Sequence, residues 1–343
     1  MEPLTHALTS LALARAGQKY LPRFGAAMVV VSGVAADLDY ASYFAGPAAF
    51  FRFHRTALHS LPASALMACV IAGAFCILDR KASSKSARAA AFPPLRFFPA
   101  LAACAIGIFG HTLLDLTTSD GVQLFWPFRE RWFAWDIVAN LDPWVLVLLV
   151  AGLFLPQVMS LVSEEIGDRK KSARGLRAAV VTLLLIGAYF VARANLHSRA
   201  VNLLLSHEYH GRIPLSAGAF PSASELFQWR GVVVTDDTIE EITVHLAGSA
   251  RFDPDRSIIH FKPQESPALD SGQRAEAAQR FLKYAQFPIA SVGRLVDGYR
   301  FELRDIRFAA DNKSPANIFL RVDFNSSLQV IRERYLFASS PNP

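Results

Sequence analysis

Long apolar runs alternate with short polar loops through the first 199 residues of the chain. Six apolar segments stand out, at roughly residues 4–16, 24–41, 57–78, 97–117, 143–162 and 178–195. A helix needs about 20 residues to cross the hydrocarbon of a bilayer, and the third, fifth and sixth segments are long enough. The first two are shorter and predict half-spans or tilted helices. The pattern therefore predicts a membrane domain of about six helices over residues 1–199.

After Ala200 the long runs give way to shorter stretches typical of strands. There are six of them, at residues 229–236, 240–248, 256–262, 299–308, 316–324 and 328–337. Residues 271–285 have the pattern of one amphipathic helix. We therefore expect residues 200–343 to form an extramembrane α+β domain.

Charge separates the two halves of the chain. The protein is 52% hydrophobic and only 19% charged, whereas an average soluble domain is roughly 25% charged. Residues 1–199 carry 19 Lys and Arg against 12 Asp and Glu, and residues 200–343 carry 16 against 17. A nucleic-acid-binding protein needs a basic face on a folded domain. Here the basic excess lies in short loops between apolar runs, so nucleic acid is not an expected partner.

The loop charges also predict the orientation in the membrane. Loops 15–23, 80–96 and 164–177 hold 13 Lys and Arg together, and the alternate loops 40–56 and 118–142 hold 4. Positively charged loops stay in the cytoplasm. We therefore expect a multi-pass protein with both chain ends, and the domain at 200–343, on the extracytoplasmic side.

Ionisable side chains in apolar segments are costly, so each is a candidate for function. The candidates are His6 in THAL, Asp37 and Asp39 in AADLDY, His54 and His59 in FHRTALHS, His111 and Asp115 in GHTLLD, and Asp136, Asn140 and Asp142 in FAWDIVANLD. In the expected topology all five patterns lie at the outer ends of their helices or in the adjoining outer loops. Random placement would not sort them in this way.

Neutral imidazole and carboxylate are ligands of zinc, manganese and iron. His111 and Asp115 are four residues apart, so they share a helical face and can bind one ion together. A single histidine on an apolar face is more often a core or capping residue, but several such groups at one face favour a divalent metal site. Asp39, Asn140 and Asp142 could individually be helix caps. Arg55 is either a clamp for a substrate phosphate or carboxylate or a membrane-flank arginine.

The depth of the carboxylates points to the class of substrate. Arg23 and Asp37 are 14 residues apart, which is about 21 Å along a helix and less than a hydrocarbon core of about 30 Å. The carboxylates are then expected below the outer headgroups. A site there meets membrane lipids or lipid-linked molecules more readily than dissolved metabolites.

The patterns THAL, AADLDY, FHRTALHS, GHTLLDLTTSDGVQLFWPF and WDIVANLDP occur in this order. Together they resemble the YdjM/YbcI-type family of bacterial inner-membrane metal-dependent hydrolases over roughly residues 1–165. That family usually has Pro-Asp-Ile-Asp where residues 36–39 read Ala-Asp-Leu-Asp, which keeps both acids. The resemblance implies a location in the bacterial inner (cytoplasmic) membrane.

At longer range the layout is similar to zinc-dependent phospholipase C and the S1/P1-type nucleases, which hold up to three zinc ions. That similarity implies metal ligation by His6, Asp37, His54 or His59, His111 and Asp115. Those families have further histidines after the His-x3-Asp pair, whereas this chain has none between His111 and His197. One or two ions are therefore the simpler expectation, with zinc favoured over manganese.

The sequence thus predicts a metal-assisted hydrolase of a phosphoester in a lipid or lipid-linked substrate. The metal lowers the pKa of bound water and polarises a phosphoryl or ester oxygen. Asp39 or Asp136 is the expected general base, and Arg55 with the Ser60 hydroxyl is expected to hold the anionic group of the substrate. Two alternatives stay open, a metal-binding membrane transporter and a non-catalytic membrane scaffold. A transport pathway should carry polar groups at both faces, whereas here they gather at one.

Overall fold

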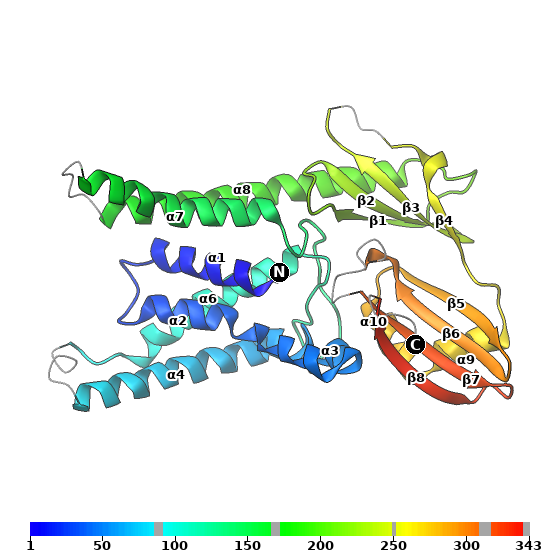
Figure 1. Ribbon diagram of the computed structural model, residues 1–343, viewed down its shortest axis with the longest axis horizontal. Coiled ribbons are helices and arrows are strands. Elements are labelled where there is room, and N and C mark those ends of the chain that lie inside the picture. Colours follow the sequence, from blue (N-terminus) through cyan, green and yellow to red (C-terminus); the bar gives the residue numbers. More distant parts are fainter. Residues whose placement is uncertain (86–91, 166–171, 249–251, 309–316, 339–343) are drawn as a thin grey trace. The chain divides into compact units, whose positions relative to one another are not determined.

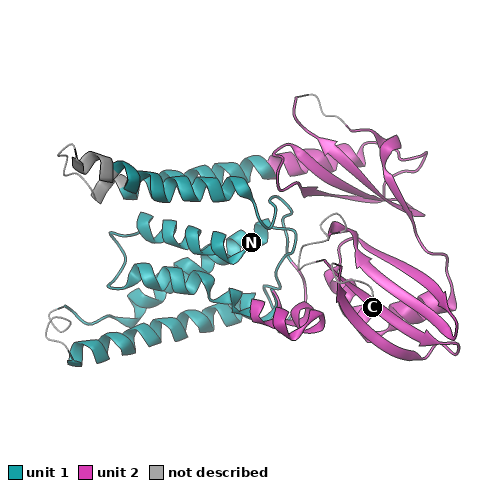
Figure 2. Ribbon diagram, in the orientation of Figure 1, with its two compact units in different colours: residues 1–39, 55–128, 133–193 teal, residues 40–54, 129–132, 194–343 magenta. Residues whose placement is uncertain are grey.

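The structure is a computed structural model that describes the chain except for residues 86–91, 166–171, 249–251, 309–316 and 339–343. The chain divides into two compact units (Figure 2). Unit 1 comprises residues 1–39, 55–128 and 133–193, and unit 2 comprises residues 40–54, 129–132 and 194–343. The boundary expected near residue 200 falls within α8 (Ser172–Leu205), which is one continuous helix.

Unit 1 is helical (Figure 1). Its helices are α1 (Pro3–Ala16), α2 (Gly25–Val34), α4 (Leu61–Lys85), α6 (Phe97–Thr117), α7 (Pro143–Glu165) and the first part of α8. Between α2 and α4 the chain forms the 3-10 helix η1 (Ala36–Ala45), the short helix α3 (Pro47–Phe53) and the 3-10 helix η2 (Ala57–His59). Helix α1 begins where the Glu2 side chain accepts a hydrogen bond from the Thr5 N–H at 3.2 Å, with Pro3 in the first turn.

Three helices of the described chain are long and apolar enough to cross a membrane, at Leu61–Lys85, Phe97–Thr117 and Gly175–Leu205. The third and sixth apolar segments are thus candidate spans as expected, and the fourth joins them. The fifth forms α7, but its described apolar stretch, Pro143–Met159, is shorter. Helices α1 and α2 have only 14 and 10 residues, so the expectation of about six spanning helices is reduced to three candidates. The basic loops 80–96 and 164–177 lie partly outside the described residues.

Small residues bring α2 and α6 together. A Cβ atom added to Gly107 of α6 would lie 2.2 Å from the Val29 carbonyl oxygen of α2, and one added to Gly33 of α2 would lie 3.3 Å from the Gly107 carbonyl oxygen. Glycine at such positions lets helix backbones approach closely. This contact brings the end of α2 against the last turns of α6, where His111 lies.

Unit 2 contains two four-stranded antiparallel sheets in which each strand pairs with its neighbour in sequence. The first sheet is β1 (Ser216–Pro221), β2 (Gln228–Val234), β3 (Thr238–His245) and β4 (Ile258–Phe261). The second is β5 (Pro288–Leu295), β6 (Gly298–Asp305), β7 (Ile318–Asn325) and β8 (Val330–Phe337). All six expected strands are confirmed, although the expected start of one at residue 316 lies outside the described residues. Strands β1 and β5 are additional, and their Gly, Ala and Pro content explains why the pattern did not predict them.

The helix expected at residues 271–285 is two short helices, α9 (Pro267–Arg274) and α10 (Glu276–Tyr284). They are separated at Ala275, whose φ of −57° and ψ of 140° do not continue a helix. Phe281 and Ala278 of α10 and Leu269 of α9 pack with Phe301 of β6 in the core of the second sheet. The mixed α+β character expected for this part of the chain is therefore correct.

Candidate metal centre

The starts of α1 and α4 and the ends of α2 and α6 lie at one end of unit 1 (Figure 1). The structure brings together there seven of the nine side chains predicted as metal ligands or catalytic groups: His6, Asp37, Asp39, Arg55, His59, His111 and Asp115. Two sets of three could hold a metal ion, with ligand atoms within 4.8 Å of one another: His59, His111 and Asp115, and His6, Asp37 and His111. All of these side chains are buried except Asp37, which is half-buried.

The first set converges on one carboxylate oxygen. Asp115 Oδ2 lies 3.2 Å from His59 Nε2 and 3.1 Å from His111 Nε2. His111 Nδ1 lies 2.9 Å from the Gly33 carbonyl oxygen. Because a carbonyl oxygen only accepts, Nδ1 carries the proton and Nε2 of the neutral ring keeps its lone pair.

The lone pair of His111 therefore faces a carboxylate oxygen across 3.1 Å. Both atoms are buried, and neither has a hydrogen-bond partner among the residues that the structure describes. Two buried acceptors that face each other are unfavourable unless a cation lies with them. The donor set of two imidazoles and one carboxylate fits a divalent metal, zinc above all.

Asp39 supports this set from behind. Its Oδ2 lies 3.1 Å from His59 Nδ1 and accepts a hydrogen bond from the Arg55 N–H at 2.8 Å. Metal-binding histidines commonly contact a carboxylate through the second ring nitrogen, which sets the ring orientation and the tautomer. Asp39 is thus placed to orient His59, which differs from the general-base role expected from the sequence.

The second set adjoins the first. His6 Nε2 lies 3.2 Å from both the Met1 carbonyl oxygen and Asp115 Oδ1, and its ring stacks on His111 with centroids 3.8 Å apart. The Met1 amine also contacts Asp115. His6 Nδ1 and Asp37 Oδ2 are buried without a hydrogen-bond partner in the described part of the chain. Both sets need His111, but its Nδ1 is hydrogen-bonded to the Gly33 carbonyl oxygen, so only Nε2 is left to bind a metal. The arrangement therefore fits one ion, with His6 and Asp37 beside it.

Arg55 balances the charge of this cluster. Its guanidinium lies 3.2 Å from Asp115 Oδ1 and 3.6 Å from Asp120 Oδ2, and it donates to Thr118 Oγ1 at 2.8 Å and to Asn140 Oδ1 at 2.9 Å. Only 1% of the residue is exposed. A guanidinium enclosed by protein acceptors is a counter-charge, so the structure does not support the predicted substrate clamp. The sequence placed Asp120 beside the GHTLLD pattern, but no spacing rule indicates that it meets Arg55.

His54 lies apart from both ligand sets. Its ring stacks on Phe50 with centroids 4.3 Å apart and meets the edge of Tyr40 at 4.5 Å, all within unit 2. His54 follows the last residue of α3, and its amide N–H continues that helix by donating to the Phe50 carbonyl. The structure therefore gives His54 a packing role, and of the two histidines in FHRTALHS only His59 reaches a ligand set.

Three further sequence candidates have local roles or lie outside the ligand sets. The Ser60 hydroxyl donates to the Ala57 carbonyl at 2.7 Å and accepts from the Ala63 N–H at 3.3 Å, so it caps α4 rather than standing open to a substrate. Asp142 accepts from two backbone N–H groups in the first turn of α7, which confirms its capping alternative. Asp136 has a positive φ of 56° and belongs to neither ligand set.

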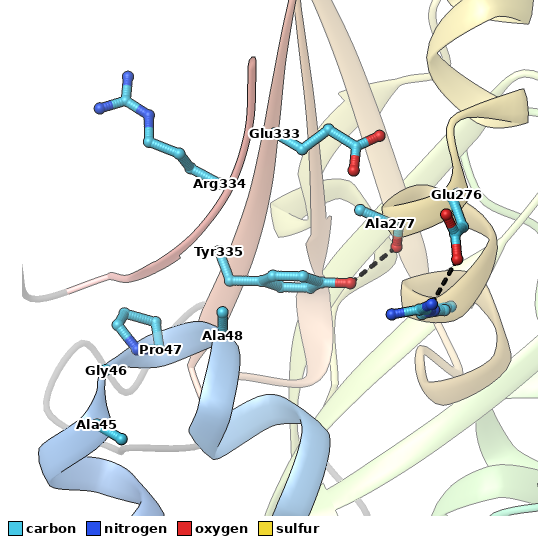
Figure 3. A pocket seen from close by; sticks show the side chains of 10 residues that line it. Ala45, Gly46, Pro47, Ala48, Glu276, Ala277, Glu333, Arg334 and Tyr335 are labelled. Carbon is cyan, nitrogen blue, oxygen red and sulfur yellow. Dashed lines mark hydrogen bonds and ion pairs between the residues drawn. The ribbon is translucent and has the colours of Figure 1, made fainter.

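Unit 2 has a hollow of about 360 Å³ between residues 45–48, α10 and β8 (Figure 3). The Tyr335 hydroxyl donates to the Ala277 carbonyl at 3.0 Å, and Glu276 pairs with Arg280. Burial raises the pKa of Tyr335 to about 12. The lining mixes arginine with glutamate and has no histidine or cysteine, so it offers no counterpart to the ligand sets of unit 1.

Comparisons with known proteins agree with the membrane half of this description. A family model described as YdjM inner membrane protein matches residues 1–197, which is more than half of the chain and includes every residue of the two ligand sets. No curated protein and no solved structure matches the chain. The more distant similarity to zinc-dependent phospholipase C and the S1/P1-type nucleases therefore has no support.

Proposed function

We propose that this chain, which belongs to the YdjM inner membrane protein family, is a metal-dependent hydrolase of a phosphoester in a lipid or lipid-linked substrate. The observation that carries the proposal is the contact between His111 Nε2 and Asp115 Oδ2, two buried acceptors 3.1 Å apart. A protein that only needed a stable helix end would place a donor at one of these positions.

His59, His111 and Asp115 would hold the metal, which we take to be zinc because two of the three donors are imidazoles. When bound, such an ion acts as a Lewis acid that lowers the pKa of water and polarises a phosphoryl oxygen. Asp39 keeps the His59 ring oriented, and the hydrogen bond to Gly33 does the same for His111. Arg55 compensates the negative charge of Asp115 through Oδ1. The two imidazoles contact the other carboxylate oxygen, Oδ2, so Arg55 does not occupy their side of the carboxylate.

Asp37 is our candidate for the group that accepts a proton from water. It is the half-buried carboxylate of the cluster, and its Oδ2 lies 3.9 Å from the His111 ring without a hydrogen-bond partner among the described residues. A general base needs a lone pair that is not already engaged and that lies beside the reacting groups. Asp39 accepts a hydrogen bond from the Arg55 N–H and contacts His59 Nδ1, so Asp37 fits the role better.

The proposal includes the side of the membrane. The basic loops, at 15–23, 80–96 and 164–177, favour a cytoplasmic location, so the metal centre would open toward the outer leaflet and residues 200–343 would be extracytoplasmic. A reporter fused after Pro343 is expected to be active only outside the cytoplasm. Cytoplasmic activity of that reporter would contradict the orientation and leave the metal chemistry untouched.

The charged groups at the other end of unit 1 do not favour the transporter alternative. Asp79, at the far end of α4, pairs with Arg23 at 2.8 Å and accepts a hydrogen bond from the Leu95 N–H at 2.8 Å. Its side chain is fully buried in this closed arrangement. An ion pathway needs exchangeable polar groups toward both faces, and a carboxylate satisfied by an arginine and a backbone amide is a structural pair.

The test uses the full chain purified in detergent. We expect about one zinc ion per chain by elemental analysis, and hydrolysis of a diacyl phospholipid in mixed micelles that stops with chelator and returns with added zinc. His59→Ala should remove both metal and activity, whereas His260→Ala, the matched change in unit 2, should keep both. Metal content that is equal in wild type and His59→Ala would refute the ligand assignment. Bound metal without hydrolysis of any phosphoester would refute the enzymatic proposal alone.

A further inference from the structure

An apolar groove of about 410 Å³ lies in unit 1 between α1, α6 and α8. Helix α6 contributes Ile106, Phe109 and Leu113 to its lining, and α8 contributes Ile186 and Phe190. Binding sites for small molecules are typically about 300–1,000 Å³, so the groove is large enough for a ligand. Thr9 has the only polar side chain in the lining.

The groove runs along α1 and α6, the two helices that carry His6, His111 and Asp115. Gly110 and Leu114 line it, and each directly precedes a ligand, His111 or Asp115. Thr9 is three residues after His6 on α1, which is close to one helical turn. A molecule held in the groove would therefore extend toward the end of unit 1 where the ligand sets lie.

The surroundings determine what can occupy the groove. Helices α6 and α8 are two of the three candidate membrane spans, so the groove faces hydrocarbon when the protein lies in a bilayer. Its lining carries no charged group, which leaves no counter-charge for an ion. A single hydrocarbon chain is the occupant that fits both the chemistry and the size.

We propose that this groove holds one acyl chain of the lipid substrate and so presents the headgroup to the metal centre. The inference rests on the proposed function and names its substrate class, a lipid with a long hydrocarbon chain rather than a soluble phosphoester. The Thr9 hydroxyl is buried and has no hydrogen-bond partner within the described residues. It is placed to donate to the ester carbonyl at the head of such a chain, a role that an apolar residue could not perform.

Gly187 of α8 allows the groove to be filled without disturbing the protein. It lines the groove, and a Cβ atom added there has nothing within 4 Å. Gly73 on α4 also has nothing within 4 Å of an added Cβ and does not line the groove. Gly187→Leu and Gly73→Leu are therefore a matched pair, with the same change in a membrane helix and only one of them in the groove.

The experiment places full-length protein in nanodiscs containing a diacyl phospholipid with a diazirine on one acyl chain. After illumination, labelled residues are mapped by mass spectrometry. We expect stronger labelling at Leu113 and Ile186 than at Leu66 and Val70, two exposed residues on α4 that report lipids around the protein. Gly187→Leu should reduce groove labelling about tenfold, because displacing about two methylene groups from the groove has that effect on affinity. Gly73→Leu should leave it unchanged.

Equal labelling of the groove and of α4, or labelling that survives Gly187→Leu, would overturn the inference. Disulfide formation between two copies of a Leu113→Cys variant would do the same, because the groove would then be an interface. The readout does not depend on hydrolysis, so the two proposals fail separately. Groove labelling without metal-dependent hydrolysis removes the proposed function and keeps a lipid site. Hydrolysis without groove labelling keeps the enzyme and removes the acyl-chain site.

Discussion

Histidine meets carboxylate in both units, but in opposite arrangements. In unit 2, His260 Nε2 lies 2.9 Å from Glu241, and 32% of the histidine side chain is exposed. In unit 1, His59 and His111 converge on Asp115, and each of these side chains is at most 2% exposed. The partly exposed pair is also contacted by Arg230, which lies 3.0 Å from Glu241, whereas the buried donor set around Asp115 Oδ2 is one that could hold a cation. The difference separates a surface contact from a candidate site.

Burial of charge alone does not make this distinction. Asp305 of unit 2 is as buried as Asp115, with side-chain exposure of 1%. It accepts from Arg307 Nε at 2.7 Å and from the backbone N–H groups of Arg307 and Gln286 at 3.0 Å. Every contact of Asp305 is thus with a donor. Asp115 has donors at Oδ1, the Met1 amine and Arg55, but its Oδ2 is buried without a hydrogen-bond partner among the described residues and lies 3.1 Å from His111 Nε2. The balance of donors and acceptors distinguishes the candidate metal ligand Asp115 from the structural carboxylate Asp305.

The largest effect is expected from His111→Ala. The change removes the ligand shared by both sets, so bound zinc should fall below detection in elemental analysis of purified protein. His260→Ala is the control in unit 2 and should retain wild-type metal content. Because a large cavity could unfold the helix bundle, His111→Gln serves as a second variant, and membrane insertion is checked for each. Full metal content in an inserted His111→Gln protein would break the comparison between the two units.

Asp305→Asn should have a large effect of a different kind. It leaves the Arg307 guanidinium buried without its carboxylate, which typically costs about 3–5 kcal/mol. We expect a lower unfolding temperature for the strand signal in circular dichroism and unchanged zinc content. Asp305→Asn should therefore lower the stability of unit 2 without changing metal binding in unit 1. Loss of zinc from Asp305→Asn protein that is still folded would show that the closed ion pair contributes to metal binding after all.

Asp39→Asn is expected to have an intermediate effect. The amide keeps the shape of the side chain but weakens its contact with His59 Nδ1, and loss of such a supporting carboxylate lowers metal affinity about 10–100-fold. Competition with a chelator of known zinc affinity measures the change. Asp142→Asn, a change at a helix cap, is the control and should leave zinc affinity as it is. If both variants bind zinc with wild-type affinity, Asp39 does not support the metal site and has only a local capping role like that of Asp142.

His54→Ala should have the smallest effect. The change removes the stacking of His54 on Phe50, and an aromatic pair of this kind contributes about 0.5–1.5 kcal/mol beyond its buried area. Zinc content and zinc affinity should match the wild type, in contrast to His59→Ala. Together, His54→Ala and His59→Ala test which histidine of FHRTALHS binds the metal. Loss of zinc from both variants would show that His54 is also a ligand.

The sequence alone determined the features that depend on local periodicity. Long apolar runs predicted the helices of unit 1, of which three are candidate membrane spans rather than about six. Short stretches predicted six strands of unit 2, because helix and strand patterns follow from backbone geometry within one segment. His111 and Asp115 were predicted as a pair for the same reason, and the structure places His111 Nε2 and Asp115 Oδ2 3.1 Å apart. The weak β pattern of β1 and β5 and the break at Ala275 were missed, since neither has a strong local signal.

Only the tertiary structure decided which candidates meet. His54 and His59 are five residues apart, and their composition does not indicate which one faces Asp115. Asp39 and Asp136 were equally good bases by sequence, yet only Asp39 contacts a candidate ligand. These outcomes depend on helices distant in sequence, brought together where Gly33 and Gly107 let α2 approach α6. A side chain's partner is determined by the packing of segments, and packing is not encoded in the period of any one segment.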